Sequence, residues 1–298
     1  MATKATTSKK PGRFGFWPQV ALTSVVAALF LVVANSAIWV NQSIFNTENF
    51  TTTAVTSLTS ESSRQALASE VVDKALADKP LVKNVAGDTA TKLVSGLLGT
   101  NQFNRVLTAS VGKLQVYVTS KEQKSVTLDL TGVKSTVERL VGVANAAGVS
   151  VAENGERLSQ VPDQVVLVDA NNSPSFYGYG LAFMWLAPIC LILALALLAY
   201  PYVRDRSKYY QVALAQGSVI LVAGLLALLV GPLFKPPVLA SITSPNVRTV
   251  VGNLYDAFLA QFNQQVYWLI VIGVLWALLP VLVWFGLGFY RKRVAKKK

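Results

Sequence analysis

The sequence contains no histidine, and its 298 residues include a single cysteine, Cys190. Without histidine there is no imidazole general base, no haem ligand of that type and none of the usual Cys/His zinc sites. One cysteine excludes a disulfide within the chain. These absences remove several classes of enzyme, and they leave only a carboxylate or Ser/Lys centre as a catalytic possibility.

Charged side chains are absent from four long apolar stretches: Val20–Val40, Tyr177–Tyr200, Val212–Leu233 and Val266–Tyr290. About 20 apolar residues in a helix cross the hydrocarbon core of a bilayer. Each stretch therefore predicts a membrane span, and the tryptophans and tyrosines at their ends are typical of interface anchors. Ion-coupled transporters keep ionisable groups at membrane depth, so this pattern argues against a secondary transporter.

The first apolar stretch has an alternative interpretation as a cleavable signal peptide, because a basic tail precedes it and Ala34–Ala37 resembles a cleavage site. The apolar character continues through Val40, which favours a membrane span. Both interpretations place the segment that follows outside the cytoplasm.

Positive charge flanks the predicted spans. The two tails and the segment Arg204–Lys208 together carry a surplus equal to the net charge of +12, while Thr47–Ser173 is nearly balanced. This distribution follows the positive-inside rule. It predicts a multi-pass protein of the plasma membrane with both termini in the cytoplasm, and it argues against nucleic-acid binding.

The predicted fold is a mainly α membrane protein with four transmembrane helices and an α-rich extracytoplasmic domain that contains a short two-stranded β element. The predicted segments are a cytoplasmic basic tail (1–18), the first span (19–41), the extracytoplasmic domain (42–176), the second span (177–200), a cytoplasmic basic loop (201–211), the third span (212–233), an extracytoplasmic loop with an amphipathic helix (234–265), the fourth span (266–290) and a cytoplasmic basic tail (291–298).

Helical periodicity dominates the extracytoplasmic domain. Ser62 and Gln65 form a predicted capping box for a helix that reaches Ala75. The remaining expected elements are a helix through Phe50–Leu58, a helix over Leu81–Leu98 after Pro80, an apolar stripe (Phe103, Leu107, Ser110, Leu114, Tyr117), a helix through Val133–Ala144 that stops at Gly148, and paired strands at Val126–Leu130 and Val165–Val168.

The second extracytoplasmic segment predicts more than a linker. Pro236-Pro237 is expected to break the chain, and Ser244-Pro245 to begin a helix. An apolar stripe then leads into the fourth span: Val247, Val251, Leu254, Phe258 and Phe262. Such a stripe needs cover, so we expect it to pack against the Thr47–Ser173 domain.

Two further patterns have plain structural interpretations. Gly217, Gly224 and Gly231 form a seam that indicates close helix packing, with a moving seam or an oligomer interface as the alternative.

Ser110 and Lys113 match S-x-x-K, but the companion motifs of penicillin-binding enzymes are missing and Ser110 lies on the apolar stripe. We therefore predict no enzyme, and no catalytic, cofactor-binding or metal-binding residue.

Phe45–Phe50, the helix beginning at Phe103-Asn104-Arg105 and the strand Val126–Leu130 resemble a family of uncharacterised four-span membrane proteins of actinobacterial type. Asn46 and Glu48 stand where aspartates are more usual in that family. The resemblance implies a bacterial origin and this topology, and it implies no established activity.

The sequence thus favours a cell-envelope protein that is anchored in the lipid bilayer and binds an envelope protein or peptide through its outer domain, with a monomer and a homo-oligomer both left open. The alternative is a permease-like mechanotransmission subunit that works with a separate cytoplasmic ATPase. In that case Arg204–Tyr210 would be the coupling segment, an analogy based on topology.

Overall fold

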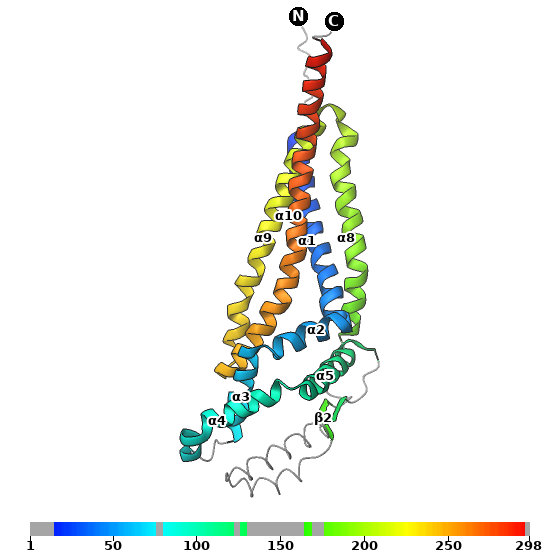
Figure 1. The fold of residues 1–298 in the computed structure, drawn as a ribbon. Helices are drawn as coiled ribbons and strands as arrows, with labels where there is room; N and C mark the ends of the chain where they lie inside the picture. Colours follow the sequence, from blue (N-terminus) through cyan, green and yellow to red (C-terminus); the bar gives the residue numbers. More distant parts are fainter. Residues whose placement is uncertain (1–14, 76–79, 122–125, 130–163, 169–175, 296–298) are drawn as a thin grey trace, which may run out of the picture. The chain divides into compact units, whose positions relative to one another are not determined.

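A computed structural model describes residues 15–75, 80–121, 126–129, 164–168 and 176–295 (Figure 1). The predicted helix at Val133–Ala144 and its stop at Gly148 lie outside these residues. The chain divides into two compact units. Unit 1 comprises Met1–Asn35, Pro188–Ala227 and Val266–Lys298, and unit 2 comprises Ser36–Ala187 and Leu228–Gln265.

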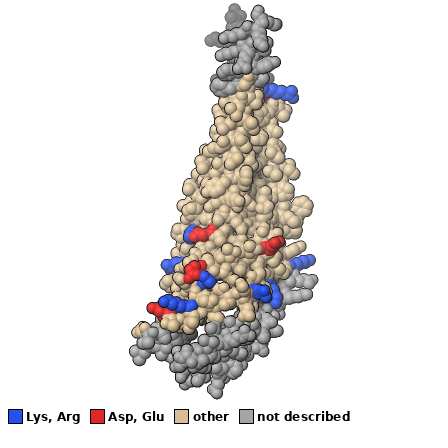
Figure 2. Space-filling model, in the orientation of Figure 1, with Lys and Arg blue, Asp and Glu red and all other residues tan. Residues whose placement is uncertain are grey.

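Four helices are long and apolar enough to cross a membrane. They are α1 (Phe16–Trp39), α8 (Tyr177–Arg204), α9 (Tyr209–Ala240) and α10 (Pro245–Ala295). They coincide with the four predicted spans, of which the first (19–41) runs past α1 into the π-helix Val40–Phe45, so the chain is a mainly α, multi-pass membrane protein. Figure 2 shows a long stretch of surface without charged side chains, with basic side chains at one end of it and acidic and basic side chains interspersed at the other.

Small and branched apolar side chains build the core of unit 1. Ala27 and Ala28 of α1 pack with Leu198 of α8, Ile220 of α9 and Leu269 of α10. The alanines let the helix backbones approach closely. Inside a bilayer the hydrophobic effect does not drive helices together, so this close van der Waals packing stabilises their association.

The glycine seam of α9 packs against α10. A Cβ on Gly217 would stand 2.5 Å from the Ala277 nitrogen, and one on Gly224 would stand 2.7 Å from Cγ1 of Ile270. In unit 2, Gly231 faces Leu259 at equally close range. The seam therefore serves packing within the chain, as the structural interpretation of its spacing predicted.

The side chain of Gln216 is fully buried in unit 1 and forms hydrogen bonds with three other residues. Its Nε2 donates to the Leu198 carbonyl at 2.9 Å, and its Oε1 accepts from Tyr202 Oη at 3.1 Å and from Trp276 Nε1 at 3.2 Å. Pro201 has no N–H and cannot complete the α8 backbone ladder. The amide of Gln216 thus cross-links three helices beside a proline in α8.

Unit 2 contains most of the short elements. They are the π-helix Val40–Phe45, α2 (Thr47–Leu58), α3 (Glu61–Ala75), α4 (Pro80–Leu98), α5 (Asn101–Thr119), β1 (Val126–Asp129) and β2 (Gln164–Val168). The two strands pair antiparallel, with Val126 opposite Val168 and Asp129 opposite Gln164. They lie in the two predicted segments, of which Val126–Leu130 was predicted from side-chain alternation and Val165–Val168 as its partner strand.

Polar side chains cap the helices of unit 2. Asn46 accepts from the Asn49 N–H at 2.9 Å at the start of α2, and Thr100 accepts from the Phe103 N–H at 3.3 Å at the start of α5. Asn46 and Asn49 belong to the motif behind the family resemblance, and here they fix a helix start.

The predicted capping box at Ser62 and Gln65 is wrong. The hydroxyl of Ser60 accepts from the Ser63 N–H at 3.4 Å, and α3 begins at Glu61. Gln65 donates to the Glu61 carboxylate at 2.7 Å instead of reaching the backbone. Ser60 and Ser62 are both competent caps. The helix starts two residues earlier than predicted, which places Glu61 in its first turn, where a carboxylate is favoured.

The prediction that Pro236-Pro237 breaks the chain is also wrong. Helix α9 continues through both prolines and ends at Ala240. A proline inside a helix removes one backbone donor and costs about 3 kcal/mol. Packing against α10 must therefore offset that cost.

The contacts between α9 and α10 in unit 2 supply this packing. Lys235 Nζ donates to both carboxylate oxygens of Asp256, at 2.7 and 2.6 Å. The hydroxyl of Tyr255 donates to the Gly231 carbonyl at 2.8 Å. The two helices thus form a hairpin closed by the short connection Ser241–Ser244.

The expected contact between the amphipathic start of α10 and the α2–α3 region is confirmed. Ser244 caps α10 at Val247 N–H, at 3.3 Å. Phe258 packs against Phe50 with ring centroids 5.3 Å apart, and Asn253 Nδ2 donates to the hydroxyl of Ser63 at 2.8 Å. These contacts join segments that are 190 or more residues apart in the sequence.

The predicted stripe of α5 holds only in part. Tyr117 is buried, but Leu114 is exposed and its neighbour Gln115 is buried. Gln115 accepts from the Thr47 hydroxyl at 2.8 Å and donates to the Ile44 carbonyl at 2.9 Å. The helix is therefore rotated so that an amide, rather than a leucine, reaches the π-helix and the start of α2.

Candidate functional site

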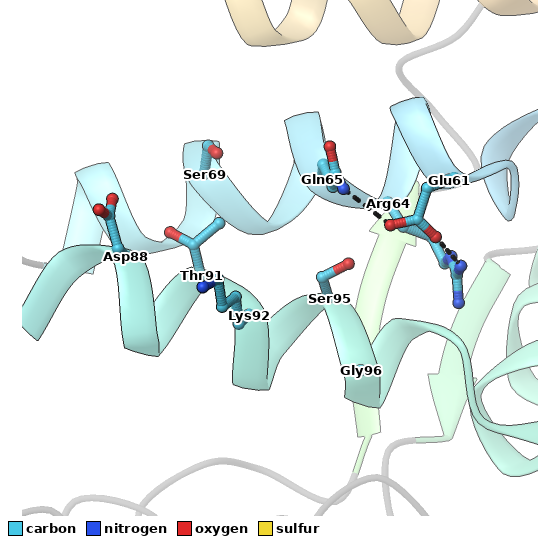
Figure 3. Close-up of a pocket in the computed structure, with 9 residues that line it drawn as sticks. All are labelled: Glu61, Arg64, Gln65, Ser69, Asp88, Thr91, Lys92, Ser95 and Gly96. Atoms are coloured by element: carbon cyan, nitrogen blue, oxygen red, sulfur yellow. Dashed lines mark hydrogen bonds and ion pairs between the residues drawn. The ribbon is translucent and has the colours of Figure 1, made fainter.

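A cleft of 510 Å³ lies between α3 and α4 of unit 2 (Figure 3). The two helices lie side by side and run in opposite directions, so Ser69 stands opposite Thr91 and Gln65 opposite Ser95. Most residues that line the cleft are polar or charged. They are Glu61, Arg64, Gln65, Ser69, Asp88, Thr91, Lys92, Ser95 and Gly96.

Helical spacing explains why both helices present polar side chains to the cleft. Glu61, Gln65 and Ser69 follow one another at intervals of four on α3, and Asp88, Lys92 and Gly96 do so on α4. Residues four apart share one helix face. Ala68 and Val72 lie three positions after Gln65 and Ser69, on the same side of α3, and both are buried.

One end of the cleft is internally neutralised. Glu61 forms an ion pair with Arg64 and accepts a second hydrogen bond from Gln65, as the dashed lines in Figure 3 show. The guanidinium of Arg64 also lies where a Cβ on Gly99 would stand. Glycine at position 99 therefore permits the observed position of Arg64.

The other end of the cleft holds two charges without a partner. Asp88 and Lys92 are both exposed, and neither forms an ion pair or hydrogen bond with any residue in the described parts of the chain. Thr91 and Ser95 lie beside them on α4, and Ser95 is only 9% exposed. A carboxylate, an ammonium group and hydroxyls are thus available to a ligand within two turns of one helix.

The arrangement suits binding by charge and hydrogen bonding. Residues 15–75, 80–121 and 176–283 contain no group of three His, Cys, Asp or Glu placed to hold a metal ion. Ser110 donates its hydroxyl proton to the Val106 carbonyl of its own helix at 2.5 Å, and Lys113 is exposed. The S-x-x-K match is therefore accounted for by local helix structure.

Comparison with protein-family models, with curated proteins and with solved structures gives no match. The family resemblance of the Phe45–Phe50 motif accordingly stays a prediction.

Sequence reasoning did not identify this cleft, since it searched for catalytic and metal-binding motifs. The available signal was the polar face that recurs at intervals of four on both helices flanking Pro80. Pairing those faces requires knowing that α3 and α4 pack against each other, which no local pattern states.

Proposed function

We propose that this chain is a binding protein of a bacterial cell envelope. Its four spans anchor it in the plasma membrane, with both termini in the cytoplasm, and the short helices α2–α5 lie outside and bind an envelope protein or peptide. The distribution of positive charge around the spans supports this orientation. The proposal assigns no catalytic step.

The observation that carries the proposal is the charged cleft between α3 and α4. Its volume of 510 Å³ falls within the range of about 300–1,000 Å³ typical of ligand sites. Asp88 and Lys92, which form no ion pair within the described residues, give it charged groups that a partner can satisfy.

Photo-crosslinking in living cells tests the binding role. A photoreactive amino acid at Thr91 lies in the cleft, and the same residue at Thr108, an exposed position on α5, serves as the control. We expect an adduct at Thr91 that the Thr108 variant does not give. Identical products at both positions, or none at Thr91, would count against a binding site here.

Single-cysteine labelling tests the orientation. In a Cys190→Ala background, a membrane-impermeant maleimide should label Thr108→Cys in intact cells. Arg206→Cys, in the connection between α8 and α9, should be labelled only after permeabilisation. The reverse result would invert the proposed topology.

The alternative function is a permease-like subunit coupled to a cytoplasmic ATPase. It is favoured by the exposed Arg204 and Arg206 at the connection between α8 and α9, which are available to an acidic partner. Purification from native membranes in mild detergent discriminates the two functions, because a stoichiometric ATPase is required by the alternative alone.

A further inference from the structure

We propose that the ligand of the α3–α4 cleft is a small zwitterion, a free α-amino acid or a short peptide, whose ammonium group binds Asp88 and whose carboxylate binds Lys92. This inference rests on the proposed binding function of unit 2 and names the ligand class of the same site.

Charge balance in the cleft selects the ligand class. The lining contains two acidic and two basic side chains, of which Glu61 and Arg64 satisfy each other. The remaining pair, Asp88 and Lys92, is one helical turn apart, with Cβ atoms about 5–6 Å apart. A simple anion would be repelled by Asp88 and a simple cation by Lys92, whereas a ligand with both charges a few bonds apart satisfies the two groups together.

The absence of aromatic residues from the lining narrows the class further. Nucleobases are usually held by stacking on aromatic side chains, and the nine lining residues include none. Ser69, Thr91 and Ser95 instead offer hydroxyls, which can donate to a carboxylate or accept from an ammonium group or a peptide N–H.

Gly96 lines the cleft and has open space around it. A Cβ at this position would meet no atom within 4 Å, so a side chain can be added there without a clash. Since alanine favours a helix over glycine by about 1 kcal/mol, Gly96→Ala should fold normally. Gly96→Leu should fold as well, and its side chain should fill part of the cleft without changing any charge.

Isothermal titration calorimetry of the full-length protein in detergent tests the inference with four probes: alanine, alanyl-alanine, N-acetyl-alanyl-alanine and alanyl-alanine amide. We expect alanyl-alanine to bind and each capped form to bind at least about tenfold more weakly, because each cap removes one charged hydrogen-bonding partner. Comparison of alanine with alanyl-alanine distinguishes a free amino acid from a peptide as the ligand.

Matched variants assign each charge. Asp88→Asn should abolish the discrimination against the acetylated probe, Lys92→Gln should abolish the discrimination against the amide, and Gly96→Leu should weaken binding of every probe. Lys113→Gln, an exposed lysine on α5, is the control and should bind as the wild type does.

The outcomes separate this inference from the function on which it rests. Equal binding of free and capped probes, binding unaffected by Gly96→Leu, or no binding of any probe overturns the zwitterion assignment. If the Thr91 photo-crosslink is still obtained, the binding function stands with another ligand class. If that crosslink is also missing, both fail.

Discussion

The hydroxyl of Ser244 donates to a carboxylate oxygen of Glu70 at 2.5 Å, and this bond joins the start of α10 to α3 across 174 positions of sequence. The same hydroxyl accepts from the Val247 N–H. One side chain therefore both caps a helix and ties together two distant segments of unit 2.

The Ser244–Glu70 bond should make the stability of unit 2 depend on pH. The hydroxyl of Ser244 lowers the pKa of Glu70 from its ordinary 4.5, partial burial opposes this, and Lys74 adds to the lowering. A carboxyl group whose folded-state pKa is lowered stabilises the fold above its unfolded pKa and loses that contribution as the pH falls through the folded value. The proteolytic midpoint temperature of unit 2 should therefore drop between about pH 7 and about pH 3.

Glu70→Gln and Ser244→Ala should each reduce this drop, and the double variant should reduce it no further than the larger single effect. Ser244→Ala should also lower stability at every pH by about 1 kcal/mol, because it removes the cap of α10. Additive effects of the two variants on the pH dependence would contradict the assigned bond.

Phe258→Ala should destabilise unit 2 by up to about 3 kcal/mol, the lower end of the range for a truncated phenylalanine, since Phe258 and Phe50 are half-buried. Limited proteolysis should then cut between α2 and α5 at lower protease concentration. Phe234→Ala on α9, where the ring is 59% exposed, is the control and should digest as the wild type does.

Gln216→Leu should destabilise unit 1 by about 1–3 kcal/mol, because it removes three interhelical hydrogen bonds and leaves Tyr202 and Trp276 without their acceptor. Titration with a denaturing detergent, followed by tryptophan fluorescence, measures the change. Gln211→Leu makes the same chemical change at an exposed position and should have little effect.

Alanine substitutions along the glycine seam should be graded. Gly217→Ala should be the most damaging, because the added Cβ meets the backbone nitrogen of Ala277 at 2.5 Å. Gly224→Ala should be milder, since it meets the side chain of Ile270, which can change rotamer. Gly286→Ala should be neutral or stabilising, because nothing lies within 4 Å. Equal detergent stability of all three variants would show that the seam does not determine packing.

The sequence predicts the features that depend on local composition. The absence of charge over about 20 residues marks the membrane spans, and Ser244-Pro245 marks the start of α10. The apolar stripe through Phe258 predicts that this helix needs cover, and the contact with Phe50 provides it.

The features that depend on tertiary context could not be predicted in the same way. Ser60 and Ser62 are chemically equivalent caps, and in the structure the hydroxyl of Ser62 instead accepts from Asn253 of α10, a contact that no local pattern states. The path of α9 through Pro236-Pro237 depends on its hairpin with α10. The burial of Gln115 in place of Leu114 depends on the backbone carbonyl of Ile44, 71 positions earlier.

The amide of Gln216 has a consequence for the order of membrane assembly. Its partners Leu198 and Tyr202 precede it in the chain, but Trp276 follows 60 positions later. At a synthesis rate of about 5–20 residues per second, that interval lasts roughly 3–12 s. During this interval Gln216 can join α9 to α8 through Leu198 and Tyr202, while its hydrogen bond with Trp276 is not yet formed. The insertion of α10 then supplies Trp276 and completes the bundle.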